Sequence, residues 1–239
     1  MIEPKIKIFC DFDGTITTKD VGENMFLAFA DSEKAYEIFN RWVNKEIDSA
    51  QEWQELLELV KDLTEEEFNS FIDSIDLTYG FNEFVEFAED NKLELIILSD
   101  GMDYYIDRIL NKNGLENLNY YSNKLIFTDN GPKAFFPYTD EECKDCGNCK
   151  RNHIIENSSD EDITIYIGDG FSDTCPVQYA DYIFAKKALL KFCEKERISY
   201  FPYKNFKDII RLMQPLIEKK KIKKRHQATL KRKNVYTQG

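Results

Sequence analysis

The sequence lacks any run of the roughly 20 apolar residues that a membrane-spanning helix needs, so we expect no membrane partner. Its first residues also lack the basic, apolar and small-residue segments of a secretory signal peptide. These two absences together predict a cytoplasmic protein. In that compartment the six cysteines are expected to be reduced or to bind a metal, and not to form disulfides.

Residues 219–239 contain no acidic side chain and nine lysines and arginines. The whole chain has a formal net charge of −12, so without those nine positive charges residues 1–218 carry −21. An acidic body repels nucleic acid, and we therefore predict no nucleic-acid partner. The basic segment is interpreted as a mobile C-terminal tail that follows a helix starting near Phe206.

Five short apolar runs predict strands, and helix-like segments lie between several of them. The runs are residues 6–10, 93–98, 163–167, 182–185 and 198–201. Strands that alternate with helices predict an α/β fold with a Rossmann-like parallel sheet covered on both faces. The first three runs end at polar clusters of Asp, Ser or Gly. Because ligands of such sheets bind at the carboxyl ends of the strands, we expect these clusters to converge.

Between the first two runs lie about 65 residues with helical patterning, too many for an ordinary connecting loop. Segments 21–30, 33–43, 50–61 and 65–74 carry apolar residues at helical spacing. They predict a helical cap (17–77) inserted into a core domain (1–16 and 78–218), with 219–239 as the basic tail. A turn sequence at residues 129–132, inside the aromatic segment 119–138, predicts a small β-hairpin.

Asp11 and Asp13 stand two residues apart, directly after the first predicted strand and before Gly14. A turn at the strand end would let both carboxylates face one reaction centre. One could attack phosphorus and form an aspartyl phosphate, while the other protonates the leaving oxygen. For the motif taken alone, a solvated Asp pair in a turn is the simpler interpretation.

Asp169 and Asp173 follow the third predicted strand in the run Gly168-Asp169-Gly170-Phe171-Ser172-Asp173. Mg²⁺ takes oxygen ligands and keeps several waters. Asp11, Asp169 and the backbone carbonyl of Asp13 could hold it, with Asp173 supporting through water. A glycine-rich turn with an Asp helix cap is the simpler alternative.

Ser99-Asp100-Gly101 ends the second predicted strand and can offer a hydroxyl and backbone N–H groups to a phosphate oxygen. Lys150 could supply a positive charge, although most lysines lie on the surface without such a role. The order of these elements and their places at strand ends fit a single phosphoryl-transfer reaction better than any one element does.

The set resembles the haloacid dehalogenase (HAD) superfamily of phosphatases, in four motifs spread over residues 5–205. These motifs are Asp11-Phe12-Asp13-Gly14-Thr15, Ser99, Lys150, and Gly168-Asp169-Gly170 with Asp173. The resemblance implies that Asp11 is the nucleophile and Asp13 the general acid/base. It also implies that Ser99 and Lys150 bind the phosphoryl group and that Asp11, Asp13 and Asp169 place Mg²⁺. The substrate would be a small phosphorylated metabolite, handled by a monomer or homodimer.

The position of the cap resembles the phosphoserine phosphatase branch. Cys146-Gly147-Asn148-Cys149-Lys150 is similar to a narrower group that acts on 2-hydroxy-3-keto-5-methylthiopentenyl-1-phosphate in methionine salvage, or on phosphoethanolamine and phosphocholine. Where phosphoserine phosphatase reads its substrate's amine with a Glu, this chain has Asp20, which could equally be a helix N-cap. A non-catalytic metal-binding or adaptor protein of the same fold would have lost some of the motif residues, all of which are present here.

Cys143, Cys146 and Cys149 are spaced by two residues, and His153 follows four residues later. Three thiolates and an imidazole could hold a structural Zn²⁺. With a fourth ligand from elsewhere, the thiolates could instead hold an iron–sulfur cluster. Three reduced cysteines in a loop are the remaining interpretation, because the motif lacks the second half of a zinc knuckle.

Overall fold

The computed structural model describes residues 5–140, 143, 145–219 and 222–236. By its internal contacts the chain divides into two compact units. The first contains Met1–Asp11, Leu77–Leu98 and Lys150–Gly239, and the second contains Phe12–Asp76 and Ser99–Cys149. The assignment of 17–77 to a cap inserted into a core of 1–16 and 78–218 stays a prediction. Among the described helices, none has the length and apolar character needed to cross a membrane.

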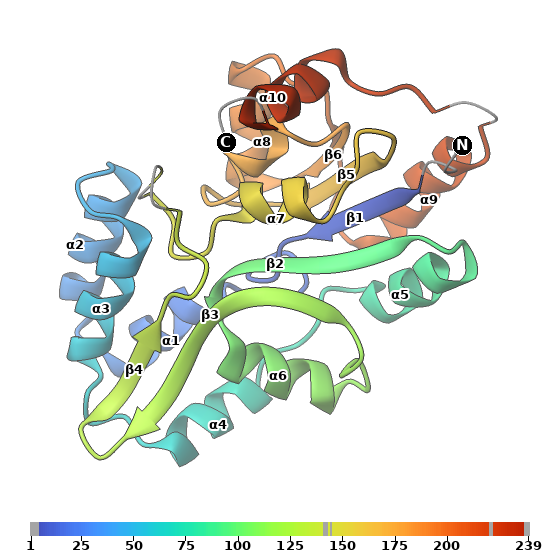
Figure 1. The fold of residues 1–239 in the computed structure, drawn as a ribbon. Helices are drawn as coiled ribbons and strands as arrows, with labels where there is room; N and C mark the ends of the chain where they lie inside the picture. Colours follow the sequence, from blue (N-terminus) through green and yellow to red (C-terminus); the bar gives the residue numbers. More distant parts are fainter. Residues whose placement is uncertain (1–4, 141–142, 144, 220–221, 237–239) are drawn as a thin grey trace. The chain divides into compact units, whose positions relative to one another are not determined.

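The first unit is built on parallel strands in the order β2-β1-β5-β6-β7, which confirms the predicted sheet. Their bounds are β1 (Ile6–Cys10), β2 (Glu94–Met102), β5 (Ile163–Gly168), β6 (Tyr182–Ala185) and β7 (Phe201–Pro202). Strand β1 lies between β2 and β5, with Cys10 beside Ile97 and Ile167 (Figure 1). The predicted strand at 198–201 is shorter in the structure because the N–H of Ile198 closes the end of the preceding helix on Cys193 O.

Helices cover both faces of these strands. Figure 1 shows α5 (Phe81–Asp90) and α9 (Phe206–Ile217) on one face, with α7 (Lys150–Glu156) and α10 (His226–Tyr236) on the other. The helix α8 (Lys187–Lys195) and the short 3₁₀ helix Pro176–Gln178 complete the unit. Phe206 packs on the rings of Phe81 and Phe84, with centroid distances of 4.8 and 5.1 Å. Crossovers between parallel strands are generally right-handed, and connections of that hand to either side of β1 would place helices on opposite faces in this way.

The basic segment differs from the mobile tail that the sequence predicts. It contains α10, whose Arg232 is buried and donates to both carboxylate oxygens of Asp181, at 3.3 and 3.2 Å. Arg232 also donates to Thr164 Oγ1 at 2.9 Å and to the carbonyl of Tyr179. The sequence of this helix shows no apolar face. A buried ion pair anchors the helix instead.

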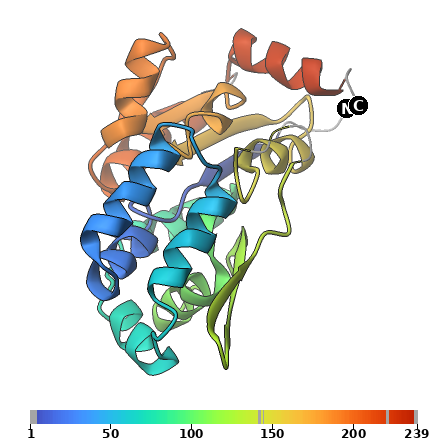
Figure 2. The same cartoon turned by 90° about the vertical axis from the view of Figure 1, so that its left-hand side faces the viewer.

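The second unit joins helices to an antiparallel hairpin. The helices are α1 (Val21–Phe29), α2 (Ser32–Val43), α3 (Ser49–Leu59), α4 (Glu65–Asp73) and α6 (Asp103–Lys112). Figures 1 and 2 show α2 and α3 side by side. Thr64 and Glu67 form the predicted capping box at the start of α4.

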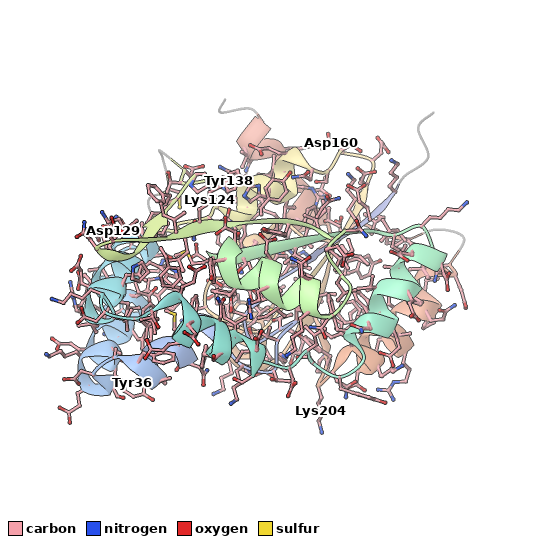
Figure 3. All side chains as sticks on the ribbon, turned by 90° about the horizontal axis from the view of Figure 1, so that it is seen from below. Tyr36, Lys124, Asp129, Tyr138, Asp160 and Lys204 are labelled. Carbon is pink, nitrogen blue, oxygen red and sulfur yellow. The ribbon has the colours of Figure 1, made fainter. Side chains whose placement is uncertain are left out.

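The predicted hairpin is confirmed as β3 (Asn119–Thr128) and β4 (Gly131–Phe135). Asp129 lies at its tip (Figure 3). Gly131 has φ +90°, and a Cβ there would lie 2.4 Å from the backbone oxygen of Lys61. The turn therefore needs glycine both for its backbone conformation and for its close approach to the segment that follows α3.

Candidate active site

Asp11 directly follows β1 and is held against the sheet by its N–H, which donates to Ile167 O at 2.9 Å. Lys150, the first residue of α7, donates to Asp11 Oδ1 at 2.6 Å and to Asp173 Oδ1 at 2.8 Å. It also donates to Ser172 Oγ at 3.1 Å. Asp11 is 4% exposed and Lys150 is 3% exposed. The first unit thus brings together three of the predicted site residues, Asp11, Lys150 and Asp173.

Burial and neighbouring charges act against each other at this group. Burial, and then the charge of Asp173, raises the pKa of Asp11 well above its ordinary value, while Lys150 lowers it. For Lys150, burial by itself lowers the pKa, but Asp11 and Asp173 outweigh burial and raise it. Lys150 is therefore a buried, charged ammonium group between two carboxylates. Because the pKa of Asp11 stays raised despite Lys150, further positive charge beside Asp11 would stabilise its carboxylate.

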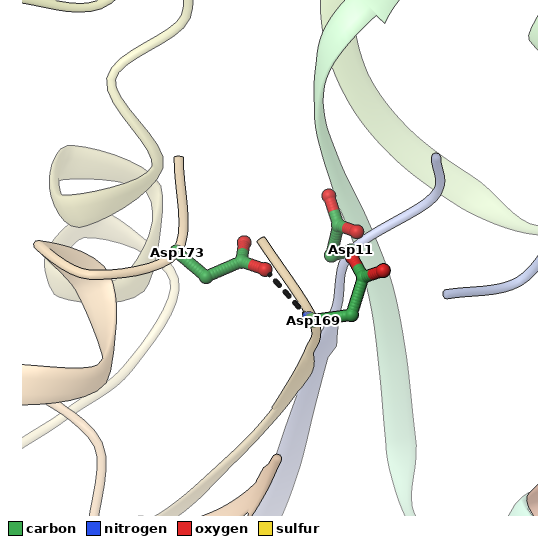
Figure 4. A group of neighbouring side chains, drawn as sticks. All are labelled: Asp11, Asp169 and Asp173. Atoms are coloured by element: carbon green, nitrogen blue, oxygen red, sulfur yellow. Dashed lines mark hydrogen bonds between the residues drawn. The ribbon is translucent and has the colours of Figure 1, made fainter. Parts of the chain in front are cut away.

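Asp169 completes a cluster in which ligand oxygens of Asp11, Asp169 and Asp173 lie within 4.8 Å of one another (Figure 4). Asp173 Oδ2 accepts the N–H groups of Asp169 at 2.9 Å and Gly170 at 3.1 Å. Its Oδ1 accepts the hydroxyl of Tyr166 at 2.6 Å. With Lys150 as a fourth donor, Asp173 fixes the turn and the lysine, which leaves Asp11 and Asp169 better suited to a cation.

The donor set suits Mg²⁺, because buried carboxylate oxygens without sulfur or imidazole are the ligands of a hard cation. Lys187 donates to Asp169 Oδ2 at 2.8 Å, so this carboxylate already has a cationic partner. Burial, and then the charge of Asp173, raises the pKa of Asp169, which is the response expected of acids crowded at a cation site. Gly168 is required beside them, since a Cβ there would lie 2.3 Å from Asp173 Oδ2.

Asp13 and Ser99 form a second group, within the second unit. Asp13 Oδ2 accepts the hydroxyl of Ser99 at 3.1 Å and that of Tyr105 at 2.7 Å. Asp13 Oδ1 accepts the N–H of Val21 at 3.0 Å. Burial, and then the charges of Asp13 and Asp20, raises the pKa of Tyr105 well above its ordinary value, so this phenol keeps its proton at neutral pH.

Asp100 and Gly101, which the sequence places after the second strand, lie inside β2. Asp100 Oδ1 accepts the N–H of Asn148 at 2.7 Å, and its Oδ2 accepts the hydroxyl of Ser49 at 2.5 Å. The indole of Trp53 donates to the carbonyl of Asp100 at 3.1 Å. Asp100 thus ties α3 to the loop before Lys150. Phosphate binding by Asp100 and Gly101 stays a prediction.

Asp20 is the N-cap of α1, where its Oδ1 accepts the N–H of Glu23 at 2.8 Å. This confirms the capping interpretation of Asp20. The alternative role, contact with the substrate, stays a prediction for the same side chain.

The cysteine motif lies in the second unit and His153 in the first. Of the three motif cysteines, Cys149 is buried and Cys143 and Cys146 are half-buried. In the described part of the chain, they belong to no group of three or more metal-ligating side chains. Burial lowers the pKa of His153 to about 4. The zinc site stays a prediction.

Several residues in these groups escaped the sequence interpretation. Tyr105 and Tyr166 fit the apolar patterns of a helix and a strand, so nothing in their spacing marks their hydroxyls. Asn148 was easier to find from the sequence, because it lies in the same short run as Lys150, two residues before it. Its side chain donates to Ser99 O at 2.7 Å and Tyr121 O at 2.9 Å, and so ties the loop to β2 and β3.

The family match, the curated relatives and the fold define the chain as a phosphatase of the HAD superfamily, a phosphoric monoester hydrolase. The chain belongs to the family described as Putative Phosphatase, which matches residues 6–205. The predicted superfamily is confirmed.

Two relatives are named 2-hydroxy-3-keto-5-methylthiopentenyl-1-phosphate phosphatase. The protein from Bacillus mycoides (strain KBAB4) is 31% identical over 218 residues, which cover 90% of this chain and 99% of the relative. The protein from Bacillus thuringiensis (strain Al Hakam) is 32% identical with the same coverage. The chain is therefore similar to these enzymes over nearly their whole length.

Solved structures agree on the fold. A phospho-aspartyl intermediate analogue of phosphoserine phosphatase matches with a TM-score of 0.67 and 20% identity, over 88% of this chain and 99% of that one. A HAD family hydrolase from Salmonella enterica serovar Typhi matches with a TM-score of 0.70 and 17% identity, over 92% of this chain and 73% of that one. At these identities the likeness concerns the fold alone.

Proposed function

We propose that this chain is a Mg²⁺-dependent phosphatase that hydrolyses a small phosphomonoester through an aspartyl phosphate on Asp11. The observation that carries the proposal is the buried Lys150 ammonium group, 2.6 Å from Asp11 Oδ1 at the end of the central strand. A cation held beside a carboxylate prepares the site for a phosphoryl group, whose charge would otherwise repel the nucleophile.

The chain's own residues divide the reaction between them. A carboxylate oxygen of Asp11 forms a bond to phosphorus while the bond to the leaving oxygen breaks, and Asp13 gives its proton to that oxygen. Asp13 then takes a proton from the water that hydrolyses the aspartyl phosphate. Lys150 and the Ser99 hydroxyl bind phosphoryl oxygens.

The covalent chain supports a joint role for the two groups. It passes between the two units at four places, which are Asp11–Phe12, Asp76–Leu77, Leu98–Ser99 and Cys149–Lys150. Asp11, Ser99 and Lys150 each stand at one of these crossings, with Asp13 two residues after Asp11, while the crossing at Asp76–Leu77 carries no proposed functional residue.

Mg²⁺ would be held by Asp11, Asp169 and the backbone carbonyl of Asp13. When bound, it supplies positive charge that offsets the phosphate and the crowded carboxylates. Asp173 would support it only indirectly, because its oxygens already accept hydrogen bonds from Lys150, Tyr166 and two backbone N–H groups.

For the substrate we propose 2-hydroxy-3-keto-5-methylthiopentenyl-1-phosphate, because relatives of that name match 90% of the chain. Phosphoserine, phosphoethanolamine and phosphocholine are the alternatives to test beside it. We further propose a cytoplasmic enzyme that acts as a monomer or homodimer.

The test compares wild type with Asp11→Asn on p-nitrophenyl phosphate, with Asp160→Asn as the matched control at an exposed position. We expect Asp11→Asn to lose at least about 1,000-fold in kcat, since no nucleophile replaces the carboxylate. EDTA should suppress the wild type and Mg²⁺ should restore it. Turnover by Asp11→Asn at the wild-type rate would refute the proposed nucleophile. The same assay over the four candidate phosphate esters, with and without Mg²⁺, identifies the substrate.

A further inference from the structure

Tyr105 is a buried tyrosine at the start of α6 with only 1% of its surface exposed. Its hydroxyl donates to Asp13 Oδ2 at 2.7 Å, which is shorter than the 3.1 Å bond from Ser99 to the same oxygen. The N–H of Val21 holds the other oxygen at 3.0 Å. All of these residues belong to the second unit. Both oxygens of the Asp13 carboxyl group are therefore fixed by donors.

The approach of Tyr105 to Asp13 depends on the missing side chain of Gly101. A Cβ at residue 101 would lie 1.6 Å from the Tyr105 hydroxyl and 2.5 Å from Asp13 Oδ2. Both distances are too short for non-bonded atoms, so with a Cβ at residue 101 Tyr105 and Asp13 could not keep their present positions. Glycine at this position thus leaves the space in which the phenol reaches the carboxylate.

A packing role alone does not account for this arrangement, because a phenylalanine would fill the same volume without a buried hydroxyl. The Tyr105 ring does pack, with its centroid 6.2 Å from that of Phe12. The hydroxyl, however, needs a partner when it is buried, and its partner here is the carboxylate proposed to move the proton.

We propose that Tyr105 is a positioning residue for proton transfer by Asp13, an inference that rests on the proposed function. By donating to Oδ2, Tyr105 holds the carboxyl group in one orientation. From that orientation the proton of Asp13 passes to the leaving oxygen as the bond from phosphorus to that oxygen breaks and the bond to Asp11 forms. Tyr105 thereby assists the departure of leaving groups whose oxygen must be protonated.

The leaving group gives a readout that separates this role from packing. An alkoxide is a poor leaving group and needs the proton, whereas p-nitrophenolate departs readily without it. Tyr105→Phe should therefore lower kcat for propyl phosphate by about 10- to 100-fold, the range of one hydrogen bond to a charged group. For p-nitrophenyl phosphate we expect a loss of less than about 3-fold, and for both esters KM should stay within about 2-fold.

Tyr104→Phe is the matched control, one residue earlier on α6. The Tyr104 hydroxyl bonds to Glu65 at 2.8 Å and to Asn69 at 3.0 Å, and not to Asp13. Tyr104→Phe should leave the ratio of the two rates at its wild-type value. Thermal unfolding of both variants verifies that each is folded.

Equal losses on both esters, or no loss on either, would overturn the role of Tyr105. If the wild type hydrolyses both esters and Asp11→Asn neither, such a result refutes only this inference. If the wild type hydrolyses neither ester with Mg²⁺ present, the proposed function fails and the role of Tyr105 fails with it.

Discussion

Glu52→Gln should make the protein more stable, and the gain should grow as the pH rises. Glu52 lies on the buried face of α3 and is only 7% exposed. Burial, followed by the charges of Asp100, Asp20 and Glu23, raises the pKa of this carboxyl group from 4.5 to about 9. At neutral pH the folded chain therefore keeps a proton on Glu52 that the unfolded chain releases.

The sign follows from linkage. Between pH 4.5 and about 9 the folded state binds more protons at Glu52 than the unfolded state, so stability is full below this window and falls across it. Each pH unit inside the window costs about 1.4 kcal/mol, which amounts to roughly 5 kcal/mol at pH 8 and about 1 kcal/mol at pH 5. Relaxation and water around a buried acid reduce such costs, so we expect Gln to gain about 2–4 kcal/mol at pH 8.

Urea unfolding at pH 5, 6.5 and 8 measures this gain, read from the midpoint at an unchanged m-value. Glu58→Gln is the matched control, because Glu58 is an exposed glutamate on the same helix. Stabilisation by Glu52→Gln that is equal at pH 5 and pH 8, or a loss of stability at pH 8, would refute the reasoning.

Two further predictions concern the basic segment and the cysteines. Arg232→Ala leaves Asp181 buried without its cation and should lower the free energy of unfolding by about 3–5 kcal/mol; a change within about 0.5 kcal/mol of that caused by Lys231→Ala, an exposed neighbour, would contradict the proposed anchor. Protein purified without chelator should contain about one Zn²⁺ per chain if Cys143, Cys146, Cys149 and His153 form the predicted site. Elemental analysis that finds neither zinc nor iron would rule out that site.

The sequence predicted the parts of the fold that repeat a simple pattern. The run at residues 6–10 matches β1 at both ends, because an apolar run stops at an acid. The hairpin turn was readable because Gly131 needs a backbone conformation with positive φ that few other residues adopt. Rules about neighbouring residues were enough to predict segments whose conformation depends only on their own short sequence.

Contacts between distant residues were beyond such rules. Glu52 looks like an exposed residue in its helical pattern, since only the packed unit shows that its side chain is buried. The partner of the Tyr105 hydroxyl lies 92 residues away, and the partner of Arg232 lies 51 residues away. In the candidate site, sequence marked the acids and the lysine, while the residues that orient them emerged only from the packing.

Strand β1 has a consequence for how the chain folds during synthesis. Its neighbours are made late, because Lys7 pairs with Glu94 and Ile6 pairs with Ile163. At ~5–20 residues per second, the ribosome takes roughly 8–30 s to travel from Ile6 to Ile163. Both edges of this apolar strand lack their partners until Glu94 is made, and one edge still lacks its partner until Ile163 is made, so the strand must avoid pairing with other chains. We therefore expect its folding yield at high expression to depend on chaperones that cover short apolar segments.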